Sequence, residues 1–304
     1  MAIKRGIIQS RGLGDIIIAL PIARHYFDQG DEIVWPVCEE FYSSVKEHVK
    51  WVNWVSIPAD PEGRFFLETP LSVFKDWGVD PDEALYLYQF LNTVPELTDP
   101  EMFNILKFDQ YKYQTAGVPF KLKWSLGRCI ARSNEGELGL ADRLKRDGLL
   151  DGRYAVVHLT GSSARVDQSI VNWLDPAVKI INVDLYKTNS IFDWIGVIER
   201  AEAVVCLDSA VANMVDQLGI NAPELYWIRR SAWDLTPVLG EAWKFVPTNL
   251  PIKEPTRVDP VKMTAEKAAR TQPQQAASGG LTSHVPFQTD KSKVPTSFMH
   301  ALRK

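Results

Sequence analysis

The sequence lacks any apolar run near the roughly 20 residues that a membrane-spanning helix needs. It also has only three cysteines in 304 residues. Cys38, Cys129 and Cys206 lie far apart, with no Cys-x-x-Cys pair and no histidine at metal-ligand spacing, so neither a disulfide scaffold nor a zinc site is expected. We interpret these cysteines as buried apolar residues. The first five residues lead into an apolar run without a small-residue cleavage site, which favours a cytoplasmic protein over a secreted one.

The negative charge of the chain is unevenly distributed. The formal net charge is −4, but from Thr256 onward eight Lys and Arg stand against three Asp and Glu, so the tail carries +5 and the first 255 residues carry −9. An acidic body is poorly suited to the phosphate backbone of nucleic acid, whereas a basic tail binds it weakly. Residues 256–304 are poor in aromatic and branched residues, which predicts a mostly disordered basic tail.

Strands and helices alternate in two separate series. The first predicts strands at 3–9, 32–37 and 52–57 with helices at 15–27 and 39–49. The second predicts strands at 155–159, 178–183, 203–207 and 223–228 with helices at 190–201 and 210–218. The proline-rich stretch between them suggests helices at 82–91 and 100–117 and an extended segment at 120–124. Such alternation predicts an α/β fold with two Rossmann-like lobes of parallel strands and a cleft between the lobes. The predicted lobes are residues 1–150 and 151–255, and the tail follows at 256–304.

The turn after the first strand contains two glycines and an acidic residue. Gly12 and Gly14 allow a ligand to approach the backbone closely, and the start of the following helix favours an anion. A plain strand-to-helix turn explains the same glycines. Asp15 lies in the first helical turn, where it is either a helix cap or a general base that takes a proton from an acceptor hydroxyl.

A second polar turn follows the strand at 155–159. It offers hydroxyl and N–H donors and one planar cation, which together suit a diphosphate, from Thr160, Gly161, Ser162, Ser163 and Arg165. A solvated loop is the alternative. His158, within the strand, is interpreted as a core histidine.

A third turn joins the apolar strand at 203–207 to a helix of small residues. An apolar run that ends in Asp-Ser and passes into a helix directs free N–H groups and a dipole at an anion, here through Asp208, Ser209, Ala210 and Val211, with Asn213 further along the helix. Lys187 and Thr188 belong to another polar turn of the same series. Because ligands gather at the carboxyl ends of parallel strands, we expect these turns to lie side by side.

Taken in order, these motifs resemble glycosyltransferase family 9, the heptosyltransferase-like enzymes with the GT-B fold. The likeness is sharpest at 12–21, at 160–163 and at 208–210, and Gly14-Asp15 through Leu20-Pro21 matches the N-terminal motif of the family. The resemblance implies that Asp15 is the catalytic base and that Gly161, Ser162, Ser209 and Ala210 hold the diphosphate of the donor. The chain departs from the family pattern at Ala210, where a Gly is usual, and at Asn213, where a His is usual. Arg165 follows the Gly-Ser cluster, and the family's Lys-x-Trp is missing there.

The resemblance implies transfer of a sugar from a nucleotide-diphosphate sugar to an acceptor hydroxyl, without a cofactor. No Asp-x-Asp pair lies in a suitable loop, which fits metal-independent chemistry. The acceptor is a saccharide, a lipid-linked glycan or modified DNA, and a phage-type glycosyltransferase acting on hydroxymethylpyrimidines in DNA is an alternative. The departures at Ala210 and Asn213 keep open a third hypothesis, a protein that binds a nucleotide or sugar phosphate without catalysis.

Overall fold

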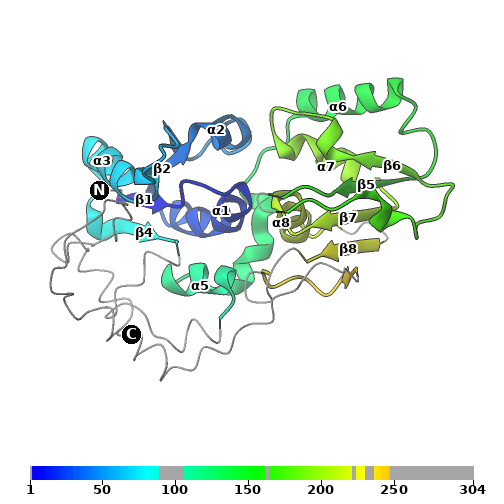
Figure 1. Cartoon of the computed structure of the whole chain (residues 1–304). Coiled ribbons are helices and arrows are strands. Elements are labelled where there is room, and N and C mark those ends of the chain that lie inside the picture. The colour runs from blue at the N-terminus through cyan, green and yellow to red at the C-terminus, as the bar shows by residue number, and fades with distance from the viewer. Residues whose placement is uncertain (1, 89–105, 162–163, 221–223, 230–235, 247–304) are drawn as a thin grey trace, which may run out of the picture.

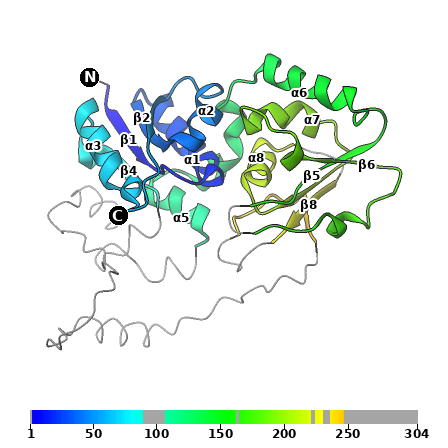
Figure 2. The same ribbon diagram turned by 45° about the horizontal axis from the view of Figure 1, so that its top comes forward.

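A computed structural model of the chain describes residues 2–88, 106–161, 164–220, 224–229 and 236–246. These residues form two α/β lobes that lie side by side, the N-terminal one in blue and cyan and the C-terminal one in green and yellow (Figure 1). The same division is visible after a turn of 45° (Figure 2). Each lobe is built on its own sheet, and every pairing in both sheets is parallel, as the alternation of strands and helices predicts. The predicted tail lies outside the described residues.

The N-terminal lobe has a four-stranded sheet in the order β3-β2-β1-β4. Its strands are β1 (Lys4–Ile8), β2 (Glu32–Cys38), β3 (Asn53–Ile57) and β4 (Ala84–Tyr86), and its helices are α1 (Leu13–Asp28), α2 (Glu39–Lys46) and α3 (Glu68–Trp77). Ile7 and Ile8 alternate between two hydrophobic clusters, one with α1 and one with Phe74 of α3, so helices cover both faces. Phe74 lies so close over Gly6 that a Cβ there would come within 2.6 Å of its ring.

The segment between the lobes is helical. It contains α5 (Phe108–Thr115), a kinked 3-10 segment (Phe120–Arg128) and α6 (Asn134–Arg146). The C-terminal sheet has the order β6-β5-β7-β8-β9. Its strands are β5 (Tyr154–His158), β6 (Lys179–Asn182), β7 (Ala203–Leu207), β8 (Glu224–Ile228) and β9 (Trp243–Phe245), with helices α7 (Ile195–Ile198) and α8 (Ala210–Leu218).

Several predicted elements differ from those observed. The helix predicted at 82–91 is wrong over its described residues, 82–88, because a short 3-10 turn (Pro81–Glu83) leads into β4, which pairs with β1. The extended segment predicted at 120–124 is instead part of the 3-10 segment. The strand at 223–228 is not the last, since β9 pairs with β8. Short apolar runs do not distinguish helix from strand by periodicity, so pairing with a distant strand decides between them.

The helix predicted at 190–201 is broken into two pieces. A 3-10 turn (Ile191–Trp194) precedes α7 and begins with a capping box. The Ser190 hydroxyl accepts from the Phe192 N–H, and the Asp193 carboxylate accepts from the Ser190 N–H. By contrast, β7 and α8 have the predicted bounds.

One hydrophobic cluster runs through both lobes. It includes Ile16 and Ile17 of α1, Val156 of β5 and Val215 of α8, all fully buried. Helix α1 packs directly against α8, and the 3-10 segment Phe120–Arg128 packs against both helices. Because a large apolar contact disfavours relative motion of two domains, this packing fixes how the lobes sit against each other.

Lys123 of the 3-10 segment forms a buried ion cluster with two carboxylates. Its ammonium nitrogen lies 2.9 Å from Asp109 of α5 and 3.3 Å from Asp216 of α8, and all three side chains are buried. The same ammonium donates a hydrogen bond to the carbonyl of Val238. The Asp216 carboxylate also accepts from three N–H donors, those of Gly240, Trp124 and Trp243. A buried charge is tolerated only when it is paired, so this cluster fixes α5, α8 and the segment before β9 relative to one another.

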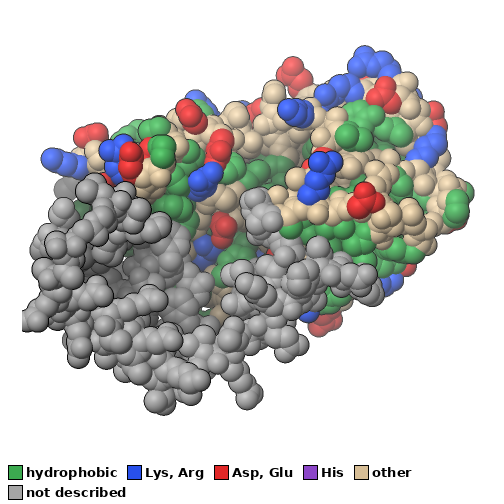
Figure 3. Space-filling view, in the orientation of Figure 1, with side chains coloured by type: hydrophobic (Ala, Val, Ile, Leu, Met, Phe, Trp, Pro, Cys, Tyr) green, Lys and Arg blue, Asp and Glu red, His purple; other side chains and the backbone are tan. Residues whose placement is uncertain are grey.

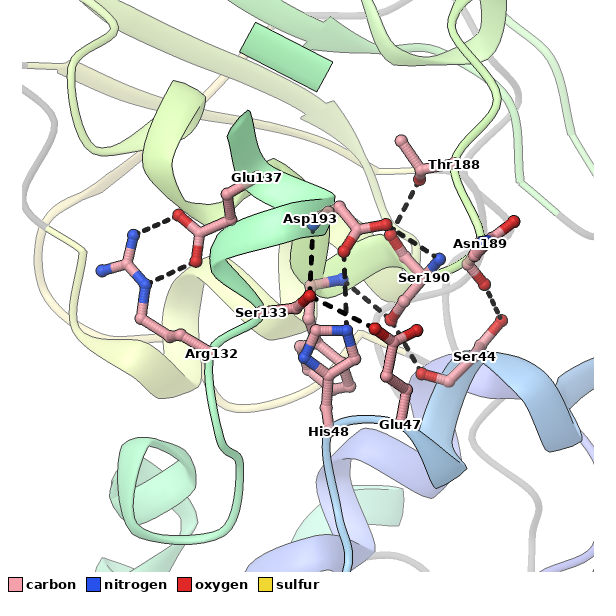
Figure 4. Close-up of polar contacts among 12 residues, drawn as sticks. Ser44, Glu47, His48, Arg132, Ser133, Glu137, Thr188, Asn189, Ser190 and Asp193 are labelled. Carbon is pink, nitrogen blue, oxygen red and sulfur yellow. Dashed lines mark hydrogen bonds and ion pairs between the residues drawn. The ribbon is translucent and has the colours of Figure 1, made fainter. Parts of the chain in front are cut away.

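A polar contact joins α2 of the N-terminal lobe to the segment before α7 (Figure 4). The Ser190 hydroxyl donates to the carbonyl of Ser44 at 2.7 Å, and the buried His48 ring lies 3.5 Å from the Asp193 carboxylate. Burial raises the pKa of Asp193. Gly136 of α6 lies against this carboxylate, because a Cβ at that position would be 2.0 Å from Asp193 Oδ1. Glycine at this position of α6 thus leaves room for the Asp193 carboxylate at the contact between the lobes.

The surface carries interspersed acidic and basic side chains on the face in Figure 3. None of the described helices has the length and apolar character that crossing a bilayer requires. Cys38, Cys129 and Cys206 are free and buried, as predicted.

Replacing Lys123 by Met leaves Asp109 and Asp216 buried without a cation. We expect the free energy of unfolding to fall by about 3–5 kcal/mol, as when one partner of a buried ion pair is removed. Urea unfolding followed by circular dichroism measures this change. Lys121→Met, at an exposed position of the same segment, is the matched control and should change stability by less than about 0.5 kcal/mol. Equal effects of the two substitutions would contradict the role given to Lys123.

Substitution by alanine should change the free energy of unfolding in opposite directions at two glycines of α6. Gly136→Ala forces the Asp193 carboxylate away from its partners, and we expect it to lower the free energy of unfolding by about 1–3 kcal/mol. Nothing lies within 4 Å of a Cβ at Gly139, so Gly139→Ala should raise it by about 0.5–1 kcal/mol through helix propensity alone. The same unfolding measurement compares the two variants, and a stable Gly136→Ala protein would show that the carboxylate adjusts freely.

Candidate functional site

The N-termini of α1 and α8 meet at the junction of the lobes. Each helix follows the carboxyl end of a central strand, β1 in one lobe and β7 in the other. A Cβ at Gly14 would lie 3.3 Å from the side-chain nitrogen of Asn213 and 3.6 Å from the Ala210 nitrogen. The absence of a side chain at Gly14 is what lets the two helix starts approach this closely. Two positive dipole ends therefore converge on one region, which favours an anion.

Asp15 faces a lysine rather than capping its helix. Gly12 is the N-cap of α1, and no side chain makes a capping hydrogen bond there. The Asp15 carboxylate instead lies 3.2 Å from the ammonium of Lys112 on α5. The Asp15 side chain is 38% exposed, whereas that of Lys112 is 4% exposed. The carboxylate is thus accessible on one side and held by a buried cation on the other.

Lys112 is fixed by two further oxygens. Its ammonium donates to the side-chain oxygen of Gln9 at 2.6 Å and to the carbonyl of Leu87 at 3.0 Å. Gln9 in turn donates to the carbonyl of Arg11 at 2.8 Å, within the turn that carries the glycines. A buried ammonium with three acceptors has little freedom to move, so the position of its carboxylate partner is fixed as well.

Two features of the turn before α1 favour glycine at position 12. Its φ is +85°, in the region that favours glycine, and a Cβ there would lie 2.8 Å from Asp15 Oδ2. Both facts make glycine the residue that fits this turn.

The turn at the start of α8 contains two amides that make no hydrogen bond within the helix. The Ser209 hydroxyl caps the helix by accepting from the Ala212 N–H at 3.4 Å, and the Ser209 carbonyl accepts from the Asn213 N–H and its side-chain amide. By the geometry of an α-helix, the N–H groups of Ala210 and Val211 have no partner within the helix. Asp208 is buried, and its N–H continues the pairing of β7 with β8.

The turn after β5 lies against Asp208. A Cβ at Gly161 would be 3.4 Å from the Asp208 carbonyl and 3.3 Å from Leu207. Thr160 pairs with Arg165 across the turn, and the Gly161 N–H donates to the carbonyl of Ala164 at 2.8 Å. Gly161 thus provides a close approach, while its amide is used inside the turn. Arg165 is exposed, and Ser162 and Ser163 lie outside the described residues.

In the turn after β6, Asp184 lies near the site, whereas the predicted Lys187 and Thr188 take part in hydrogen bonds elsewhere. Lys187 is exposed and its carbonyl accepts from Arg143 of α6, while the Thr188 hydroxyl donates to the Ser190 carbonyl in the contact of Figure 4. Within the described residues, neither makes a hydrogen bond to the α8 turn. Asp184 does face this region, because it lies 3.4 Å from His158 at the end of β5.

Sequence reasoning missed Lys112, Asp184 and the polar role of His158. Asp184 carried a usable signal, since it directly follows a predicted strand whose carboxyl end faces the site. Lys112 carried none, because it is distant in sequence from Asp15 and only the packing of α5 brings them together. Among the described residues, no group of three or more His, Cys, Asp and Glu side chains is arranged to hold a metal ion.

Comparison with known proteins shows similarity of fold. Neither a family model nor a curated protein sequence matches the chain. Among solved structures, a glycosyl transferase family 9 protein from Veillonella parvula DSM 2008 is 12% identical, with a TM-score of 0.50 over 89% of this chain and 90% of that one. E. coli ADP-heptose LPS heptosyltransferase II is 12% identical, with a TM-score of 0.46 over 88% of this chain and 98% of its own. The chain therefore has a fold like that of glycosyltransferase family 9, the two-lobed α/β arrangement of the GT-B type.

The approach of the two helix starts can be tested by a double-mutant cycle. Gly14→Ala places a methyl group against the Asn213 amide, and Asn213→Ala removes that amide. We expect the stability cost of Gly14→Ala to shrink in the Asn213→Ala background by about 0.5 kcal/mol or more, since residues in contact couple. Urea unfolding of the four proteins measures the coupling. Gly139→Ala combined with Asn213→Ala is the control pair, and strict additivity at Gly14 would contradict the contact.

Proposed function

We propose that the chain is a metal-independent glycosyltransferase that moves a sugar from a nucleotide-diphosphate sugar to an acceptor hydroxyl. The observation that carries this proposal is the meeting of the α1 and α8 N-termini beside Asp15. Transfer of a sugar from a nucleotide-diphosphate sugar needs both a region that binds the diphosphate and an accessible carboxylate next to it. The family 9 glycosyl transferase with the same fold supports this class of reaction.

The donor diphosphate is assigned to the C-terminal lobe. The open amides of Ala210 and Val211, with the dipole of α8, face the position where negative charge develops as the diphosphate leaves. The turn after β5 lies beside them through Gly161, and the exposed Arg165 supplies a cation from the same turn. Preorganised donors of this kind stabilise the leaving group without reorganisation of solvent.

Asp15 is assigned the role of general base. The acceptor hydroxyl gives its proton to the Asp15 carboxylate as its oxygen forms the new bond to the sugar. The bond between the sugar and the phosphate oxygen breaks, and the diphosphate leaves with the electron pair. Lys112 orients the carboxylate through the 3.2 Å ion pair while leaving its other side accessible.

The acceptor is distinguished by direct assay. The full chain is incubated with radiolabelled ADP-, UDP- and GDP-sugars and with lipid A precursors, oligosaccharides or hydroxymethylated DNA. Label in a glycan or lipid supports the heptosyltransferase-like activity, and label in DNA supports the phage-type alternative. Binding of a nucleotide sugar without transfer to any acceptor would favour the non-catalytic binding protein.

Asp15→Asn should abolish most of the transfer without loss of donor binding. We expect the rate to fall by about 10²–10⁴-fold, because the amide cannot take the acceptor's proton. Nucleotide affinity, measured by calorimetry, should change little, since the diphosphate is held by the other lobe. Asp28→Asn, at the opposite end of α1, is the matched control and should keep full activity. An Asp15→Asn protein with unchanged turnover would rule out this base.

A further inference from the structure

His158 lies between a carboxylate and the hydroxyl that caps α8. Its Nδ1 is 2.8 Å from Ser209 Oγ, and its Nε2 is 3.4 Å from Asp184 Oδ1. The three residues stand at the carboxyl ends of β5, β6 and β7, which are neighbours in the sheet. The His158 side chain is 15% exposed, so solvent reaches the ring.

The proton positions in the unliganded site follow from the partners of the ring. Burial raises the pKa of Asp184, but hydrogen bonds from His158, Thr160 and the Leu159 amide outweigh it, and the pKa lies below its usual value. Asp184 is therefore ionised and only accepts, so the single N–H of a neutral imidazole belongs on Nε2. Nδ1 then presents a lone pair, and the Ser209 hydroxyl must donate to it. In this state the hydroxyl proton points at His158, not toward the open start of α8.

Protonation of the ring reverses this hydrogen bond. The imidazolium donates from Nδ1 to Ser209 Oγ, which frees the hydroxyl proton for another acceptor. It also places a positive charge beside Ser209, the N-cap of α8. A bound anion gains from both changes, because it acquires an additional donor and a nearby cation.

We propose that His158 is a positioning residue that takes up one proton from solvent when the donor diphosphate binds, and that it thereby turns the Ser209 hydroxyl toward the phosphate. This inference rests on the proposed function, because it uses the same diphosphate region. The proton uptake makes donor affinity depend on pH, which binding by backbone N–H groups alone would not do. Because the complex binds one more proton than the free chain, donor binding is stronger at lower pH and weakens as the pH rises.

The surrounding groups leave His158 as the residue that responds. Asp184 faces the ring from the segment after β6. Cys206 of β7 is paired with His158 in the sheet, and burial raises the pKa of its thiol, which therefore stays neutral. Asp208 adjoins Ser209, with Lys107 and Arg229 among the charges on that side. Arg165 is the charged residue of the turn after β5. Of the side chains named here, the His158 ring is the one that contacts both the Asp184 carboxylate and the Ser209 hydroxyl.

Calorimetry with a nucleotide sugar tests the proposal. The diphosphate of such a ligand is a diester and does not titrate between about pH 5 and 8, so any proton taken up on binding is bound by the protein. The ADP-, UDP- or GDP-sugar that binds the wild-type chain is titrated in two buffers of different ionisation enthalpy. We expect uptake of up to one proton per ligand and an affinity that falls by up to about tenfold per pH unit. In His158→Gln both effects should vanish, whereas His25→Gln, in α1, should retain them.

A conservative variant of Asp184 tests whether His158 acts by taking up a proton or only by supporting the fold. Asp184→Asn removes the charge that supports the imidazolium, so the proton uptake should persist but move to lower pH. Binding without proton uptake, or uptake unchanged in His158→Gln, would overturn the role of His158 and leave the proposed function intact. If no nucleotide sugar binds, both the proposed function and this inference fail.

Discussion

The direct packing of α1 against α8 is the constraint on which the rest of the structure depends. It joins the two lobes through one apolar core, and it brings together the two helix starts that follow the central strands. Gly14 sets how close they come, since any side chain there would meet Asn213 or the Ala210 backbone. The result is a region with two converging helix N-termini, which favours an anion, and an accessible carboxylate beside it. Neither lobe has this arrangement alone.

Helix α5 links this region to the buried charges that support it. Asp109 and Lys112 lie one turn apart on α5. The first pairs with Lys123, which also binds Asp216 of α8, and the second pairs with Asp15 of α1. Because buried charges are costly unless paired, α5 is fixed from two sides. The position of the Asp15 carboxylate on α1 and the orientation of α8 thus both depend on α5, which lies in the segment between the two lobes.

Sequence patterns were most informative where one strand and its helix formed a single local unit. The apolar run at 203–207, the Asp-Ser turn and the helix at 210–218 appear at the predicted bounds, because strand length, the cap and the small-residue helix are all local properties. The same logic failed at 82–91, where three residues form a strand only because β1 lies beside them. It also failed at 120–124, where a 3-10 turn directs Lys123 inward to its two carboxylates.

The sequence by itself determined the two parallel-sheet lobes, the glycine turn before Asp15 and the Ser209 cap, since each follows from hydrophobic period and local hydrogen bonding. Only the tertiary structure decided what surrounds them. Lys112 reaches Asp15 from another helix, and His158 stands between Asp184 and Ser209 because three strands are neighbours in one sheet. The partners of Lys112 and Ser209 are set by packing over long sequence separations, which a local pattern does not encode.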